Sequence, residues 1–208
     1  MNFVTPDHFF PQCWELVRLL RTYDVQLPII YNLSGYERVD SLQATEAYAD
    51  IYLPDFKYAD RELAKALSHC DDYPAVALEA IAEMVRQKGF LDVCEGHTLE
   101  AIAQKGVLVR HLILPGQVQN SLDALSMLFL EFGRNLPLSV MSQYHPVQPC
   151  VLSEMDRRIT EEEFQQIYEH ILSLGFQHVF VQYPEKKGQL NFLPDFTQSH
   201  PFRGNWKR

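Results

Sequence analysis

Charged side chains stand at two places where the sequence otherwise predicts buried strands. Asp55 and Lys57 follow an apolar run two residues apart, and in an extended segment that spacing puts both on one face. Such a pair either forms a surface ion pair or holds a polar ligand from one side. Arg110 interrupts a second apolar run, where a buried guanidinium needs an anionic partner. That partner is either a carboxylate of the protein or the carboxylate or phosphate of a ligand.

Further polar residues follow other apolar runs, where parallel strands would end. They are Thr5, Asp7, His8, Asn32, Ser34, Gln143 and His145. Gly35 can supply the positive φ of a turn beside them. His145 is a lone histidine, and such residues pack in a core or at its rim more often than they bind a ligand. Arg110 and His111 are neighbours in one predicted strand, so their side chains should point to opposite sides of the sheet.

The sequence lacks the common catalytic and phosphate-binding motifs. There is no P-loop, dinucleotide-binding glycine motif, nucleophile elbow or zinc-binding histidine pair. The cysteines Cys13, Cys70, Cys94 and Cys150 are far apart, which favours free thiols over a disulfide framework or a metal site. A metal-dependent α/β-barrel hydrolase is therefore the weakest of the functions we consider.

Alternating apolar runs and helical patterns predict an α/β fold with parallel strands, as a sheet or a barrel. The expected strands cover residues 2–5, 27–31, 49–53, 107–114, 138–141 and 178–182. Helical patterns occupy the segments between them, and Thr160 with Glu163 forms a capping box. Because parallel α/β folds place their chemistry at the carboxyl ends of strands, the polar residues above are the candidate site.

Composition limits the possible partners. The 208 residues are 47% hydrophobic and carry a net charge of −9, as expected for a globular protein that does not bind nucleic acid. No apolar run is long enough to span a membrane, and the first residues do not resemble a signal peptide. We therefore expect a cytoplasmic protein without a membrane partner.

Several stretches resemble the radical S-adenosylmethionine (SAM) proteins related to pyruvate formate-lyase-activating enzyme, in particular an uncharacterised iron–sulfur branch. The matching stretches are NFVTPDHFFPQ, LPIIYNLSGYE, DIYLPDFKYAD, VRHLILPG, SQYHPV and NFLPDF. The resemblance implies a partial (β/α) TIM-like barrel over residues 1–150. Residues 151–208 would add a C-terminal helix, a short strand and an irregular tail packed on the same domain.

The resemblance also implies a SAM site at the strand ends. Its residues would be Thr5, Asn32, Ser34, Gly35, Asp55, Lys57, Arg110 and His145. Thr5 falls where the family's Gly-Gly-Glu-type segment contacts the methionyl amino group, although the two glycines are absent here. Asn32, Ser34 and Gly35 correspond to the turn facing the methionyl and ribose groups. His145 corresponds to a residue near the adenine.

One departure from the family affects activity. The family holds a [4Fe–4S] cluster on a C-x-x-x-C-x-x-C motif, because iron–sulfur clusters need thiolate ligands. That motif is absent from the 208 residues, and the first barrel strand that precedes it is not found either. We therefore expect no cluster in this chain, and no catalytic residue is assigned.

The departure leaves two hypotheses open. In the full-length family, SAM yields a 5′-deoxyadenosyl radical that abstracts hydrogen from a glycyl-radical enzyme or another protein substrate. On the first hypothesis, this chain is part of such an enzyme and lacks the activity on its own. On the alternative hypothesis, it is a non-catalytic small-molecule-binding or interaction module derived from the barrel. In either case residues 2–5 would form an exposed edge strand open to self-association.

Overall fold

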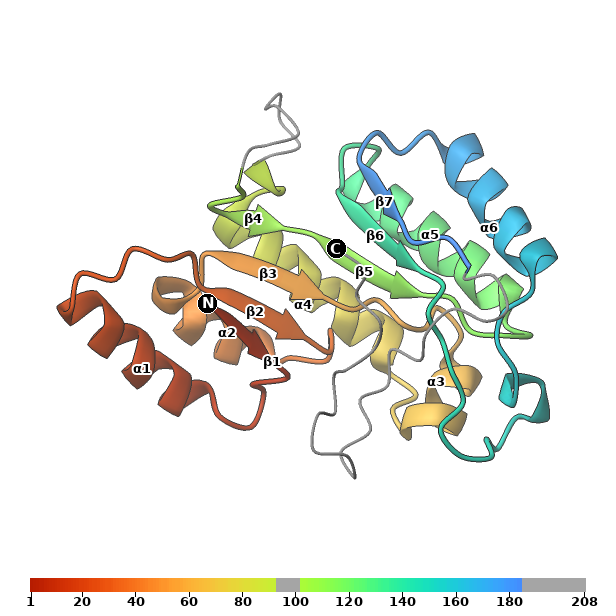
Figure 1. The fold of residues 1–208 in the computed structure, drawn as a ribbon, viewed down its shortest axis with the longest axis horizontal. Coiled ribbons are helices and arrows are strands. Elements are labelled where there is room, and N and C mark those ends of the chain that lie inside the picture. The colour runs from red at the N-terminus through yellow and green to blue at the C-terminus, as the bar shows by residue number, and fades with distance from the viewer. Residues whose placement is uncertain (93–101, 185–208) are drawn as a thin grey trace, which may run out of the picture.

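A computed structural model of the protein describes residues 1–92 and 102–184 (Figure 1). The strands are β1 (Asn2–Val4), β2 (Ile30–Leu33), β3 (Ile51–Pro54), β4 (Gly106–Val107), β5 (Val109–Leu112), β6 (Leu138–Met141) and β7 (Val179–Val181). The helices are α1 (Phe10–Thr22), α2 (Val39–Thr45), α3 (Arg61–Ser68), α4 (Tyr73–Lys88), α5 (Val118–Phe132) and α6 (Glu161–Leu174), with 3₁₀ turns at Glu46–Tyr48 and Ser153–Met155. The order of elements confirms the predicted α/β class.

All strand pairs are parallel and form two sheets, ordered β1-β2-β3-β4 and β5-β6-β7. Strands β4 and β5 are consecutive parts of one segment, separated only by Leu108. This segment pairs first with β3 and then with β6. An isolated bridge between Asp55 and Arg110 joins the two sheets at the carboxyl end of β3. Within the described residues β1 and β7 are edge strands, so the strands form an open arc and not a closed barrel.

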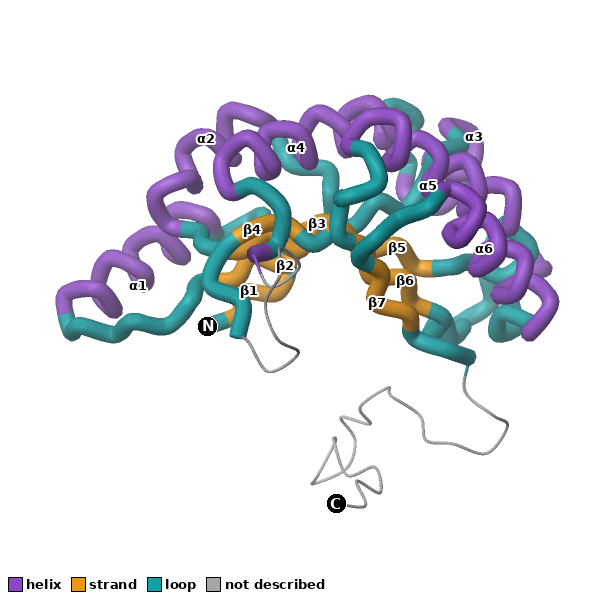
Figure 2. Tube along the Cα trace, turned by 90° about the horizontal axis from the view of Figure 1, so that it is seen from above, coloured by secondary structure: helices purple, strands orange, loops and turns teal. Residues whose placement is uncertain are grey.

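The helices lie on the convex side of this arc (Figure 2). The strand side chains that face them are fully buried, among them Tyr31, Tyr52 and Val109. Because strand side chains alternate, the intervening residues face the concave side. No described helix lies on that side (Figure 2). His111 is buried toward the helices whereas Arg110 points to the concave side, as the alternation of strand side chains predicts.

Local signals explain where α6 and β2 begin. Thr160 caps α6 as predicted, because its hydroxyl accepts a hydrogen bond from Glu163 N–H and the Glu163 carboxylate accepts one from Thr160 N–H. β2 begins at Ile30 and not at the predicted position 27. Pro28 has no N–H to donate, and the N–H of Ile29 is bound by the Asp50 side chain at 2.8 Å. Regular pairing therefore starts one residue later.

The C-terminal elements continue the same architecture. β7 pairs with β6, and α6 contacts α5. The NFLPDF stretch and nearly all of the predicted tail lie outside the described residues. Across the described parts of the chain, no helix is both long enough and apolar enough to cross a membrane.

Candidate functional site

Three of the predicted site residues form one charge cluster at the carboxyl ends of β3 and β5. An Asp55 carboxylate oxygen lies 2.5 Å from an Arg110 guanidinium nitrogen, and the other lies 3.6 Å from Lys57 Nζ. The side chains of Asp55, Arg110 and Lys57 are 19%, 22% and 37% exposed. The anionic partner that Arg110 requires is therefore a carboxylate of the protein itself.

This cluster retains unused binding capacity. Two cations share one carboxylate, so the cluster carries a formal excess of one positive charge. Arg110 Nε is buried and has no hydrogen-bond partner within the described residues. A buried donor without a partner is costly, and a ligand oxygen would satisfy it. The arrangement can thus hold an anionic or zwitterionic group on the concave side.

Backbone pairing fixes the distance between Asp55 and Arg110. Asp55 follows β3 directly, and its N–H donates to Leu33 O of β2 at 3.0 Å. The next residue, Phe56, donates its N–H to Arg110 O at 2.8 Å. The carboxylate and the guanidinium therefore meet across a bridge between neighbouring segments, which orders both before any ligand arrives.

A buried histidine holds the segment after β3 from the helix side of the sheet. His111 is fully buried; its Nδ1 lies 2.7 Å from Phe56 O and its Nε2 lies 2.9 Å from Ser121 Oγ. Burial lowers the pKa of His111, so the ring is neutral. Because a carbonyl only accepts, Nδ1 carries the proton and Nε2 accepts from the Ser121 hydroxyl. His111 therefore has a structural role on the face opposite to Arg110.

Asn120, at the start of α5, holds the next part of the same segment. Its side-chain oxygen accepts from Ala59 N–H at 2.9 Å and Asp60 N–H at 3.2 Å, and its amide nitrogen donates to Lys57 O at 3.0 Å. One buried amide thus satisfies three backbone groups of the loop that carries Lys57.

Tyr73, the first residue of α4, joins the loops after β2 and β3. Its hydroxyl accepts from Lys57 N–H at 3.0 Å and lies 3.0 Å from Ser34 O and 2.9 Å from Asp55 O. Burial raises the pKa of Tyr73 well above its ordinary value, so the hydroxyl keeps the proton that it donates to these carbonyls.

Gly35 allows the two loops to approach each other. Its φ is +83°, and a Cβ at this position would lie 2.0 Å from Asp55 O and 2.9 Å from the Tyr73 hydroxyl. The predicted positive φ is confirmed. The close approach to the Asp55 backbone is a second reason for glycine that the sequence did not reveal.

Ser34 is engaged by a buried acid. Glu37 Oε1 accepts hydrogen bonds from the N–H and the hydroxyl of Ser34, both at 2.9 Å. Burial, together with the neighbouring Asp7 carboxyl, raises the pKa of Glu37 to about 8. The Ser34 side chain is therefore committed to shaping the loop after β2.

The remaining predicted residues lie after β1, within β2 and after β6. Thr5 is exposed, has φ of +50° and donates its N–H to Asn32 O at 2.9 Å. Asn32 pairs in register with Leu53. His145, in the segment after β6, accepts at Nδ1 from Arg158 Nε at 3.4 Å. Within the described residues, no hydrogen bond or ion pair joins His145 to the Asp55–Arg110 pair.

Three residues that hold the cluster in place were missed at the sequence level. They are Glu37, Tyr73 and Asn120. Asn120 offered a weak signal, because it is a polar side chain near the start of an otherwise apolar helix pattern. Tyr73 and Glu37 offered none, since their roles depend on which loops the fold places beside them.

Comparison with known proteins adds a fold likeness. No family model matches the chain. An uncharacterized protein of Methanocaldococcus jannaschii is 26% identical over 174 residues, which cover 81% of this chain but 45% of that protein. A crystal structure of a domain of pyruvate-formate lyase-activating enzyme from Bacteroides vulgatus superposes with a TM-score of 0.57 at 13% identity, covering 88% of this chain and 98% of that domain. This likeness establishes the fold. The chain spans less than half the length of its curated relative.

The residues present do not fit a [4Fe–4S] cluster. Cys13 is buried and Cys70 and Cys150 are partly buried, all as free thiols, and Cys94 lies outside the described residues. No group of three or more His, Cys, Asp or Glu side chains in the described parts could hold a metal ion. The cysteine spacing over the whole sequence likewise departs from C-x-x-x-C-x-x-C.

Proposed function

We propose that this protein is an activating-enzyme-like member of the radical SAM proteins and that the Asp55–Lys57–Arg110 cluster binds the amino-acid end of SAM. The observation that carries the proposal is the convergence of these three side chains at the carboxyl ends of parallel strands. The fold likeness to an activating-enzyme domain supports the same reading.

The chemistry of SAM suits this cluster. Its methionyl end is a zwitterion, with an ammonium and a carboxylate on one carbon, beside a sulfonium. Asp55 can accept hydrogen bonds from the ammonium, while Lys57 and the unpartnered Nε of Arg110 can donate to the carboxylate. Thr5, Asn32, Ser34, Gly35 and His145 complete the proposed site around the rest of the ligand.

The radical step is a proposal about the whole protein and not about these residues. A bound [4Fe–4S] cluster would supply the electron that cleaves SAM, but the residues here do not fit one. Hydrogen abstraction from a glycyl-radical enzyme or another protein substrate therefore requires cluster ligands from polypeptide beyond these 208 residues. What this chain's own residues do is bind and orient SAM.

The second candidate is a non-catalytic module that kept SAM or small-molecule binding. The absence of the cysteine motif favours it. Anaerobic reconstitution with iron and sulfide tests the assignment that both candidates share, namely that these 208 residues hold no cluster. Several irons per chain with a brown chromophore would contradict that assignment, whereas a colourless product agrees with it.

Calorimetric titration with SAM tests the binding proposal directly. We expect the wild type to release or absorb heat with a single site, and Arg110→Met to weaken binding at least about tenfold, equivalent to about 1.4 kcal/mol. Arg134→Met is the matched control, because Arg134 is exposed and lies before β6. No heat with the wild type, or equal affinity for both variants, would contradict the proposed site.

A further inference from the structure

Two carboxyl groups meet behind the loop that carries Ser34. Asp7 lies between β1 and α1, and Glu37 lies just before α2; Glu37 is 5% exposed. The Asp7 carboxyl lies close enough to Glu37 to contribute to its raised pKa. Asp7 Oδ1 and Glu37 Oε2 are both buried and lack a hydrogen-bond donor within the described residues.

Two ionised carboxylates in this position would leave both oxygens unsatisfied. Carboxylate oxygens only accept hydrogen bonds, so the two atoms cannot bond to each other unless one of them carries a proton. A single shared proton satisfies both and removes the repulsion between like charges. The other Glu37 oxygen remains free to accept from Ser34.

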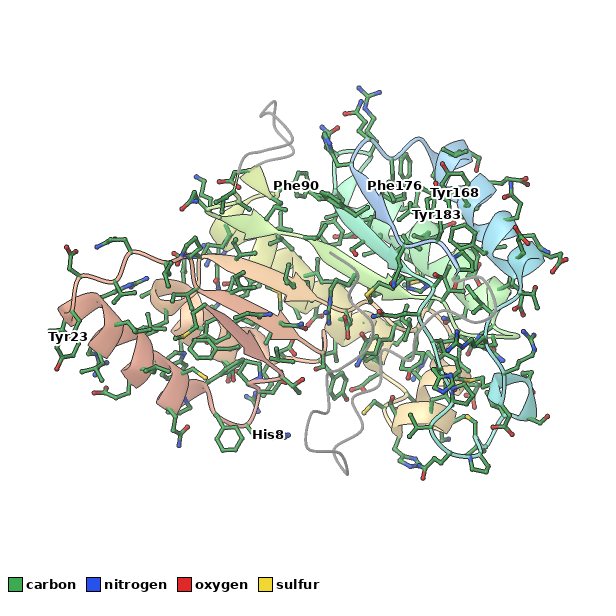
Figure 3. All side chains as sticks on the ribbon, in the orientation of Figure 1. His8, Tyr23, Phe90, Tyr168, Phe176 and Tyr183 are labelled. Carbon is green, nitrogen blue, oxygen red and sulfur yellow. The ribbon has the colours of Figure 1, made fainter. Side chains whose placement is uncertain are left out.

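Other groups around Glu37 do not relieve this repulsion. No ion pair joins Asp7 or Glu37 to a Lys or Arg in the parts of the chain described. Tyr73 of α4 also faces Glu37, and the negative charge of Glu37 contributes to its raised pKa. Of the flanking residues, Tyr36 bonds to Asp72 and Arg38 pairs with Asp40, while His8 is exposed at the outer side of the molecule (Figure 3).

We propose that Asp7 and Glu37 share one proton at neutral pH and act as positioning residues, locking the segment after β1 to the loop after β2. The lock fixes Ser34, and through it Gly35, in the place where the loop meets Asp55 and Tyr73. It does not depend on which ligand binds. Its effect on SAM affinity does rest on the proposed function.

The lock has a definite pH dependence. The pKa of Glu37 in the fold, about 8, lies above its ordinary value of 4.5, so between these limits the folded protein binds a proton that the unfolded chain does not. The contribution to stability is complete below the ordinary value and is lost as pH rises through the raised one. Above that range Glu37 is ionised and the lock is lost.

Glu37→Gln is the decisive variant, because a glutamine keeps the oxygen that accepts from Ser34 and supplies a permanent N–H for Asp7. We expect the melting temperature of the wild type, measured relative to Glu37→Gln, to fall by at least about 3 °C between pH 5 and pH 9, a shift on the scale of 1 kcal/mol for a domain of this size. Asp7→Asn should remove the same dependence, since its amide donates to Glu37. Glu131→Gln, an exposed residue of α5, should leave the wild-type profile unchanged.

Two further measurements keep the outcomes distinct. Carbon-detected NMR should report a protonated Glu37 carboxyl at pH 7. SAM affinity should weaken above pH 8 in the wild type and stay level in Glu37→Gln. A flat melting-temperature difference, or an ionised Glu37 at pH 7, would overturn the lock whether or not SAM binds. Failure of SAM to bind with the pH-dependent difference intact would refute only the proposed function.

Discussion

At the scale of single residues, the charged cluster depends on neutral side chains that sequence motifs do not reveal. Tyr73, Asn120 and His111 each bond to backbone groups of the segment after β3. Tyr73 and Asn120 belong to helices on the convex side, and His111 bonds to Ser121 of one of these helices. Their hydrogen bonds hold the main chain of this segment in place, and the position of the main chain determines where the charged side chains lie.

Gly35→Ala tests the closest approach between the two loops. The new Cβ would lie 2.0 Å from Asp55 O at a φ of +83°, so the loops must separate. We expect a loss of about 3 kcal/mol or more in the free energy of unfolding, from overpacking and backbone strain together. Urea denaturation measures it.

Gly175→Ala is the matched control for this substitution. Gly175 has a φ of +80° and a Cβ there would meet nothing within 4 Å, so only the backbone cost of about 1 kcal/mol remains. Equal losses in the two variants would mean that the loops do not meet as the structure places them.

At the scale of elements, caps and strand ends were predictable where the signal is local. The strand predicted at residues 138–141 coincides with β6 (Leu138–Met141). The run predicted over 107–114 is divided instead, because the chain changes its pairing partner from β3 to β6 at Leu108. A continuous apolar sequence does not specify which strands it pairs with, so a change of pairing partner cannot be predicted from it.

The same distinction applies to the site. Asp55, Lys57 and Arg110 could be selected from the sequence because charged residues at the ends of apolar runs are unusual and parallel strands bring those ends together. Asp7 and Glu37 could not be selected as a pair. They are thirty positions apart in the sequence, and only the pairing of β1 with β2 brings the segments that carry them side by side.

Thr160→Ala tests a local element signal. The variant removes the hydroxyl that accepts from Glu163 N–H at 3.2 Å at the start of α6. We expect a loss of about 1 kcal/mol, typical for an N-cap, seen as a drop of a few degrees in melting temperature. Thr160→Ser retains the acceptor and should lose less than half as much. Equal losses would show that the methyl group matters and not the cap.

At the scale of the whole molecule, the open arc has an available edge. Met1 O and Thr5 N–H both bond to β2, so the N–H groups of Asn2 and Val4 point away from it. Val4 is 66% exposed, and β1 has no second partner strand among the described residues. Such an edge can pair with another chain.

We therefore expect the protein to self-associate through β1 as its concentration rises. Val4→Pro removes an outward N–H without losing a bond to β2 and should reduce the associated fraction, whereas Val4→Thr keeps the N–H and should behave like the wild type. Analytical ultracentrifugation measures the association. A wild type that stays monomeric at its highest attainable concentration would contradict this expectation.

The single hydroxyl of Tyr73 has a mechanical consequence for the arc. It touches Ser34 O, Asp55 O and Lys57 N–H, and it sits on the first residue of a sixteen-residue helix. A small sliding of α4 would therefore carry both loops in the same direction. The spacing between these two loops would survive such a displacement, while their distance from β1 and β6 would change. Tyr73 thus couples the two loops, so that they move together with the start of α4.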